Sequence, residues 1–148
     1  MDNSFLNNDR TIFITGTIEQ DENSENIKKN IIRMATEKPN QPINIIIDSD
    51  GGDSFTAISI AELMLLYESI EFRVIVSGEC VSAAFFIYLA GTTRYAFPHS
   101  IFMTHNALLS FTANTNQEAK KVEQFIKTTG EVTDDFIKEI LKRTKLTY

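Results

Sequence analysis

Two short segments of this sequence contain residue types that could catalyse a reaction. One is Asp50–Asp53 (DGGD) and the other is Gly78–Ala84 (GECVSAA). Adjacent glycines let backbone N–H groups approach a ligand without an intervening side chain. Ser82 stands at the predicted start of an apolar helix, where free N–H groups and the helix dipole stabilise a developing oxyanion. These features make Ser82 a candidate nucleophile.

A serine needs a base to act as a nucleophile at neutral pH, and histidine is the usual one. His105 ends the apolar stretch Ile101–Thr104 and is the candidate base. The second histidine, His99, lies in a Pro-His-Ser turn and is interpreted as a surface residue. Cys80 is a rival nucleophile for the same histidine. It precedes the predicted helix, however, and free cysteines are usually buried and inert.

Each of these motifs also has a structural explanation. A Gly-Gly pair commonly forms a tight strand-to-helix turn, and Ser82 could simply cap the helix that follows it. A histidine at a strand end is more often structural than catalytic. A phosphate-binding loop is not indicated, because no Gly-Lys-Ser/Thr follows the glycines. Residue spacing alone therefore leaves the catalytic and the structural interpretations open.

The elements that must position these residues alternate between strands and helices. Strands are predicted at Thr11–Thr15, Ile43–Ser49, Phe72–Val76, Arg94–Phe97 and Ile101–Thr104. Helices are predicted at Ser24–Thr36 with Ser24 or Asn23 as cap, at Ser54–Ser69 with Phe55, Ile58, Ala61 and Leu65 apolar, at Val81–Ala90, and at Asn116–Lys145 running through Gly130. This order predicts one α/β domain with a largely parallel sheet. Both candidate segments then follow the carboxyl end of a strand, where such folds bind ligands.

Composition limits the classes of function. A net charge of −6 and a pI near 4.9 argue against a sequence-independent nucleic-acid binder. Cys80 is the only cysteine, so an intramolecular disulfide cannot form. The polar N-terminus lacks the features of a signal peptide, and the longest apolar run, Val81–Ala90, is shorter than the roughly 20 residues of a membrane span. The sequence predicts a cytoplasmic protein without a metal or cofactor.

Four segments, in order, resemble the proteolytic subunit of the Clp protease family, ClpP, within the ClpP/crotonase superfamily. They are Asp9–Ile18 (DRTIFITGTI), Ile43–Asp53 (INIIIDSDGGD), Gly78–Gly91 (GECVSAAFFIYLAG) and Arg94–Leu108 (RYAFPHSIFMTHNAL). Any one of them is weakly specific, but the four in register, from about Leu6 to Tyr148, are strong. The resemblance implies repeated β-β-α units in a single domain spanning 1–148. It divides that domain into a head over about 1–106 and a handle region with a long helix over 107–148.

The resemblance also implies a serine endopeptidase that hydrolyses unfolded proteins or short peptides through an acyl-enzyme. Ser82 would be the nucleophile and His105 the general base. The N–H groups of Gly52 and Ala83 would form the oxyanion hole. A substrate peptide would add as an extended strand to the backbone near these groups. The residues expected to bind it are Gly51, Asp53, Ser54, Leu108, Leu109 and Ser110.

Partners are implied by the same resemblance. The family forms homo-oligomeric rings that stack through the handle helices, so a homo-oligomer is expected. Only a few polar residues precede the first strand. The family's axial-loop segment is then reduced or absent, and normal docking to a AAA+ unfoldase is not expected.

The sequence departs from the family's pattern at several positions. Asp50 stands where the family usually has proline, which places a negative charge near the expected oxyanion hole. Ala107 replaces a proline that usually follows the catalytic histidine. Leu109 and Ser110 replace glycines at the start of the handle, which could narrow the substrate groove. The geometry around His105 and the width of the groove are the properties these departures affect.

The third member of the family's catalytic triad is an acid beyond the handle helix, and this chain reaches Tyr148 before that position. Asp134 and Asp135 fall on the predicted handle helix, so neither is assigned this role. Two interpretations remain: a peptidase with a Ser–His dyad, or an impaired subunit that serves as an assembly module. An acyl-CoA enzyme of crotonase architecture is a third class. That class needs no Ser–His pair, whereas Ser82 and His105 are both present.

Overall fold

The computed structural model describes residues 8–105 together with 124, 127, 128, 130, 131, 134, 135 and 138. The chain divides into two compact units, Met1–Thr104 and His105–Tyr148, and each is described by itself. This division falls close to the head–handle boundary that the sequence predicts. That the two units form one domain stays a prediction.

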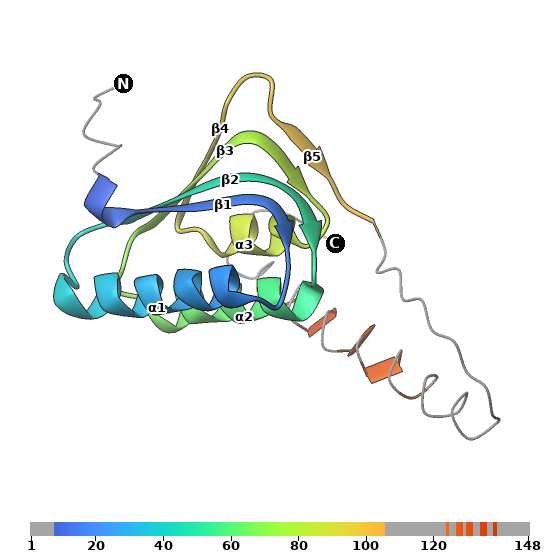
Figure 1. Cartoon of the computed structure of the whole chain (residues 1–148), viewed down its shortest axis with the longest axis horizontal. Helices are drawn as coiled ribbons and strands as arrows, with labels where there is room; N and C mark the ends of the chain where they lie inside the picture. The colour runs from blue at the N-terminus through green and yellow to red at the C-terminus, as the bar shows by residue number, and fades with distance from the viewer. Residues whose placement is uncertain are drawn as a thin grey trace. The chain divides into compact units, whose positions relative to one another are not determined.

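Strands and helices alternate along the first unit, which confirms the predicted α/β class (Figure 1). A 3-10 helix at Asn8–Arg10 precedes the first strand. The strands are β1 (Thr11–Ile18), β2 (Ile43–Gly52), β3 (Phe72–Val81), β4 (Thr93–Ala96) and β5 (Ile101–Met103). The helices are α1 (Glu22–Glu37), α2 (Ser54–Leu66) and α3 (Ala84–Ala90). In Figure 1 the sheet arches over these three helices, which all lie on the same side of it.

All strand pairs of the sheet are parallel, in the order β1-β2-β3-β4, and β5 pairs with β3. The first half of β3, from Arg73 to Val76, pairs with β4. The second half, from Glu79 to Val81, pairs with β5. One strand therefore changes its neighbour halfway along its length.

The core lies between the sheet and the helices. Rows of residues in register point from the strands toward the helices, and each row is buried: Ile12, Ile45 and Val74, followed by Ile14, Ile47 and Val76. β-branched residues suit strands that are covered by helices. The helices complete the core with Ile27, Ile31 and Met34 of α1, as the spacing predicts, and with Ile58, Ala61 and Met64 of α2. Phe55, the first apolar residue of the predicted helix, is 44% exposed at the start of α2.

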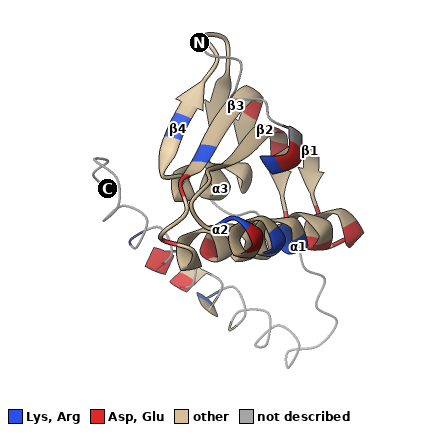
Figure 2. Ribbon diagram, turned by 90° about the vertical axis from the view of Figure 1, so that its left-hand side faces the viewer, with Lys and Arg blue, Asp and Glu red and all other residues tan. Residues whose placement is uncertain are grey.

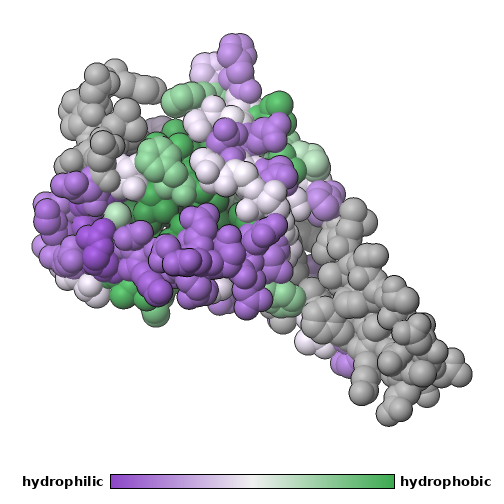
Figure 3. Space-filling model, in the orientation of Figure 1, coloured by the Kyte–Doolittle hydropathy of each residue, from purple (hydrophilic) through white to green (hydrophobic). Residues whose placement is uncertain are grey.

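Helix α1 begins earlier than predicted. Its cap is Asp21, whose carboxylate accepts the Ser24 N–H at 2.9 Å, so the predicted cap at Ser24 or Asn23 was wrong. The Ser24 hydroxyl instead donates to Glu19 O. An aspartate satisfies the free N–H groups of the first turn as well as a serine does. Lys, Arg, Asp and Glu residues occur along α1 (Figure 2), and the surface over this helix is hydrophilic (Figure 3).

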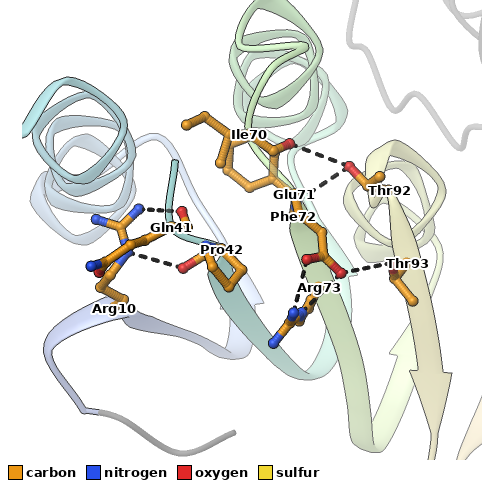
Figure 4. Close-up of polar contacts among 9 residues, drawn as sticks. All are labelled: Arg10, Gln41, Pro42, Ile70, Glu71, Phe72, Arg73, Thr92 and Thr93. Carbon is orange, nitrogen blue, oxygen red and sulfur yellow. Dashed lines mark hydrogen bonds and ion pairs between the residues drawn. The ribbon is translucent and has the colours of Figure 1, made fainter. Parts of the chain in front are cut away.

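A cluster of polar contacts lies near the amino-terminal ends of the strands (Figure 4). The Arg10 side chain is 6% exposed and donates to the carbonyls of Pro42, Met34, Lys38 and Gln41. Burial is the main cause that lowers the pKa of Arg10 from its ordinary value. A second group of contacts lies at the start of β3 and β4, where Glu71 pairs with Arg73 at 2.8 Å and accepts from the Thr93 hydroxyl at 3.2 Å.

Two strands are longer than the sequence predicts. The turn predicted at Asp50–Asp53 was wrong in part, since β2 continues to Gly52 and pairs with Thr17 and Ile18 of β1. The turn predicted to begin at Gly78 was also wrong, since β3 continues to Val81. The register shifts between Thr15 and Thr17 in the β1–β2 pair and between Ile47 and Ser49 in the β2–β3 pair. Irregularities of this kind let a strand continue past polar residues and glycines.

The described residues of the second unit, between 124 and 138, are helical and exposed. Gly130 is among them, so a helix through this glycine is confirmed at these positions. The rest of the predicted helix Asn116–Lys145 lies outside the described residues.

Candidate active site

Ser82 lies in a tight turn between β3 and α3. Its φ of 53° is in the left-handed region, which residues with a side chain rarely adopt. The helix begins at Ala84 rather than at Val81, its cap position is Ala83, and no side chain caps it. The structural explanation of Ser82 as a helix cap is therefore excluded. Strained backbone of this kind persists where the surrounding structure holds it, and it is concentrated at functional sites.

The Gly-Gly segment at the end of β2 lies directly against this turn. A side-chain carbon added at Gly51 would lie 2.7 Å from the Ser82 Cβ, 2.7 Å from Val81 O and 3.1 Å from Ala83 N. Gly51 and Gly52 have φ values of 98° and 131°, which glycine alone adopts without strain. The structure thus brings together the two segments that the sequence singles out.

A buried hydroxyl that the sequence analysis missed supports the glycine segment. Ser49 is 1% exposed, donates to Gly16 O at 2.6 Å and accepts the Gly51 N–H at 3.1 Å. It therefore links β1 to the residue that packs on Ser82. A serine at an inward-facing position of an otherwise apolar strand was the available sign of this role.

The predicted oxyanion-hole residues differ in exposure. Ala83 is 1% exposed, and no hydrogen bond within the described part of the chain uses its N–H. Gly52 is exposed and packs so closely on Ile18 that an added side-chain carbon would overlap with Ile18 O. Gly52 and Ala83 directly follow, in the chain, the two residues that pack together, Gly51 and Ser82.

Two of the predicted substrate-binding residues begin α2. The Asp53 carboxylate caps this helix by accepting the Thr56 N–H at 2.7 Å, and the Asp53 N–H donates to Ile18 O at 2.7 Å. Ser54 is the first residue of the helix. Gly51, also predicted to bind substrate, is buried against the Ser82 turn. Leu108, Leu109 and Ser110 lie outside the described residues.

Strand β5 holds the Ser82 turn from the other side. The Ser82 N–H donates to Met103 O at 2.7 Å, beyond the last β3–β5 pair, Val81 with Met103. The Phe102 ring packs against the rings of Phe85 and Tyr88 on α3, with centroid distances of 6.2 Å and 5.0 Å. The turn is thus fixed by a strand that is itself anchored on the helix.

The two histidines occupy different units. His99 is exposed in the turn between β4 and β5, as the sequence predicts. His105 follows Met103 by two positions, is exposed, and is the first residue of the second unit. Its assignment as general base stays a prediction.

Cys80 has the properties of an inert core residue. It is 0% exposed, and burial raises the pKa of its thiol to about 12. Since the thiolate is the nucleophile, iodoacetamide at pH 8 is expected to leave Cys80 unmodified in the folded chain and to modify it after unfolding in urea. The raised pKa also means that folding keeps the thiol protonated, so its contribution to stability is lost as pH rises from about 9 toward 12. Rapid modification of the folded chain would contradict this burial.

Other chemistry at this edge of the sheet is limited. The exposed Asp50 carboxylate accepts from the Thr17 hydroxyl at 3.2 Å.

Across the described residues, no group of three or more His, Cys, Asp or Glu side chains is arranged to hold a metal ion. No helix within the same residues combines the length and apolar character needed to cross a membrane.

Comparisons with known proteins identify relatives of this chain. ATP-dependent Clp protease proteolytic subunit 2 of Nocardia farcinica is 29% identical over 128 residues, which cover 85% of this chain and 62% of that protein. Subunit 2 of Mycolicibacterium paratuberculosis and subunit 1 of Mycobacterium tuberculosis are each 30% identical over 122 residues, covering 81% of this chain and 60% of the relative. The chain therefore spans about 60% of the length of these relatives.

A family model gives the broader match. The Clp protease model matches residues 2–147, which is nearly the whole chain. Together with the relatives above, this match places the protein in the Clp protease family.

Proposed function

We propose that this chain is a serine peptidase of the ClpP type that cleaves unfolded proteins or short peptides. Ser82 acts as the nucleophile and His105 as the general base. The N–H groups of Gly52 and Ala83 bind the oxyanion. The relatives in the comparisons are named as proteolytic subunits of ATP-dependent Clp proteases, which supports this class of reaction.

The proposed reaction is an acyl transfer in two steps. The Ser82 hydroxyl attacks the peptide carbonyl while His105 takes its proton, and the carbonyl oxygen becomes an oxyanion held by backbone N–H groups. The C–N bond then breaks, and the leaving amine receives the proton from His105. Water, activated by the same histidine, releases the acyl group from Ser82 and restores the hydroxyl.

One observation carries the proposal. Ser82 is held at a φ of 53° between β3 and α3, against Gly51 on one side and Met103 O on the other. A serine that served only as a helix cap would need neither this conformation nor a glycine beside it. Parallel strands bring these segments to one edge of the sheet, where a peptide can pair with exposed backbone.

The test is labelling of the chain by a fluorophosphonate, which reacts only with an activated serine. We expect the wild-type chain to be labelled. Ser82→Ala and His105→Ala should each abolish or nearly abolish labelling. Circular dichroism is the control that both variants fold. Cleavage of a fluorogenic peptide should follow the same order. Labelling that persists in Ser82→Ala would refute the assignment of the nucleophile.

A second candidate function is that of a subunit without peptidase activity that assembles with other copies of this chain into a homo-oligomer. It is the alternative if neither acid of the handle helix serves as the third catalytic group; of these two, Asp135 is exposed and paired with Lys138 at 3.3 Å. Loss of the acid from a triad costs about 10⁴ in rate. A folded wild-type chain that is not labelled, yet assembles in sedimentation experiments, would select this function.

A further inference from the structure

β3, the strand that leads to Ser82, contains a bulge, and a carboxylate of the neighbouring strand β2 lies opposite it. β2 and β3 pair in register as far as Ile47, and pairing resumes at Ser49. Asp48 alone therefore stands opposite three residues of β3, Ser77–Glu79. Extra residues of this kind bend a strand, increase its twist and leave backbone groups without their usual partners.

The Asp48 side chain replaces the missing partner. Its Oδ1 accepts the Glu79 N–H at 2.9 Å. The backbone at Gly78 passes directly against the same carboxylate, since a side-chain carbon added there would overlap with it. On β3 the Ser77 hydroxyl donates to Ile47 O at 3.3 Å. The bulge is therefore held by hydrogen bonds from both strands.

The bulge bears on the site because it directly precedes the part of β3 that leads into the Ser82 turn. It lies where β3 exchanges β4 for β5 as its neighbour. Beyond Glu79 the chain pairs with β5 and then turns at Ser82, whose N–H donates to Met103 O. A change in the bulge therefore shifts the segment that carries the nucleophile. Misplacement of a reacting group by about 1 Å costs about a hundredfold in rate.

We propose that Asp48 is a positioning residue for Ser82, because its carboxylate oxygen fixes the bulge that sets the path of residues 79–82. The kinetic part of this inference rests on the proposed peptidase function. The contact is a hydrogen bond to a backbone N–H, so an acceptor oxygen is required and the negative charge is not. Asparagine keeps such an oxygen, whereas alanine removes it.

The experiment compares Asp48→Ala and Asp48→Asn with Asp21→Ala. Asp21 is a matched control, because its carboxylate also accepts a backbone N–H at 2.9 Å, at the start of α1. Both alanine variants are expected to unfold at a lower temperature. Fluorophosphonate labelling should slow by about tenfold to a hundredfold in Asp48→Ala, stay within about threefold of wild type in Asp48→Asn, and remain unchanged in Asp21→Ala. Wild-type labelling in Asp48→Ala, or equal losses in Asp48→Ala and Asp48→Asn, would overturn the proposal.

Amide hydrogen exchange is a second readout that does not need a reactive serine. Asp48→Ala should speed exchange at Glu79–Ser82 by about tenfold or more and leave α1 unchanged, and Asp21→Ala should do the reverse. If wild-type chain is not labelled but this exchange pattern is found, the peptidase proposal fails and the positioning role stands. Unchanged exchange at Glu79 in Asp48→Ala overturns the positioning role whether or not the serine reacts.

Discussion

Replacement of Gly51 by alanine is expected to slow fluorophosphonate labelling of Ser82 by at least about a hundredfold. The new Cβ would lie 2.7 Å from both the Ser82 Cβ and Val81 O, and 3.1 Å from Ala83 N. None of these atoms is the far end of a flexible side chain, so the clash cannot be relieved by a change of rotamer. Either the end of β2 or the Ser82 turn must move, and both movements separate the proposed nucleophile from the proposed oxyanion hole.

Gly16→Ala is the matched control for this prediction. Gly16 also has a positive φ, 69°, but nothing lies within 4 Å of the position of its added Cβ. It therefore shares the backbone strain of Gly51→Ala, about 1 kcal/mol or slightly more, without the clash. Urea unfolding of both variants measures the loss of stability that the strained backbone causes. Only Gly51→Ala should also lose labelling while still folded, because only its new Cβ displaces the Ser82 turn. Wild-type labelling in folded Gly51→Ala would show that the glycine does not shape the turn.

The largest loss of stability is expected from Arg10→Ala, at about 3 kcal/mol or more in the free energy of unfolding. Small domains have only about 5–15 kcal/mol in total, so much of the chain would unfold in mild denaturant. The guanidinium donates to four carbonyls at the end of α1 and in the turn to β2: Met34 at 2.8 Å, Gln41 at 2.7 Å, Pro42 at 3.0 Å and Lys38 at 3.3 Å. Met34 O and Lys38 O also accept the backbone N–H groups of Lys38 and Gln41, so the expected cost comes from losing the buried donor that joins the end of α1 to the turn before β2.

Two further substitutions make this prediction specific. Arg10→Lys keeps the charge but not the planar set of donors, so it should recover only part of the stability. Arg33→Ala removes an exposed arginine of α1 that is paired with Glu37 at 3.0 Å, and it should cost about 0.5 kcal/mol or less. The measurement is the midpoint and slope of urea unfolding. Equal stability of Arg10→Ala and Arg33→Ala would contradict the role of the buried guanidinium.

The parts of the fold that depend on local periodicity were predictable. The spacing of Ile27, Ile31 and Met34 identified α1 and its buried face, and the apolar runs identified the strands. The parallel order followed from the alternation of strands and helices. The ends of the strands were not predictable, because bulges depend on hydrogen bonds to the neighbouring strand rather than on residue type.

Some features of the candidate site were likewise predictable from the sequence, and others were not. The meeting of Gly51 with Ser82 could be expected, since parallel strands place their carboxyl ends at one edge of a sheet. The left-handed conformation of Ser82 could not, because it results from how β5 and the end of β2 confine the turn. Ser49 and Asp48 were missed for a related reason. Their partners, Gly16 and Glu79, lie on other strands and become neighbours only through the pairing register.

The exchange of neighbours along β3 divides the sheet into regions of unequal cooperativity. The half of β3 that leads to Ser82 pairs on one edge with a strand of three residues, β5. The three residues of β5, Ile101, Phe102 and Met103, are 56%, 40% and 46% exposed. Short strands with little buried surface open locally at a much lower free energy than the whole domain. We therefore expect β5 and the Ser82 turn to open locally at a lower free energy than the sheet formed by β1, β2 and the first half of β3.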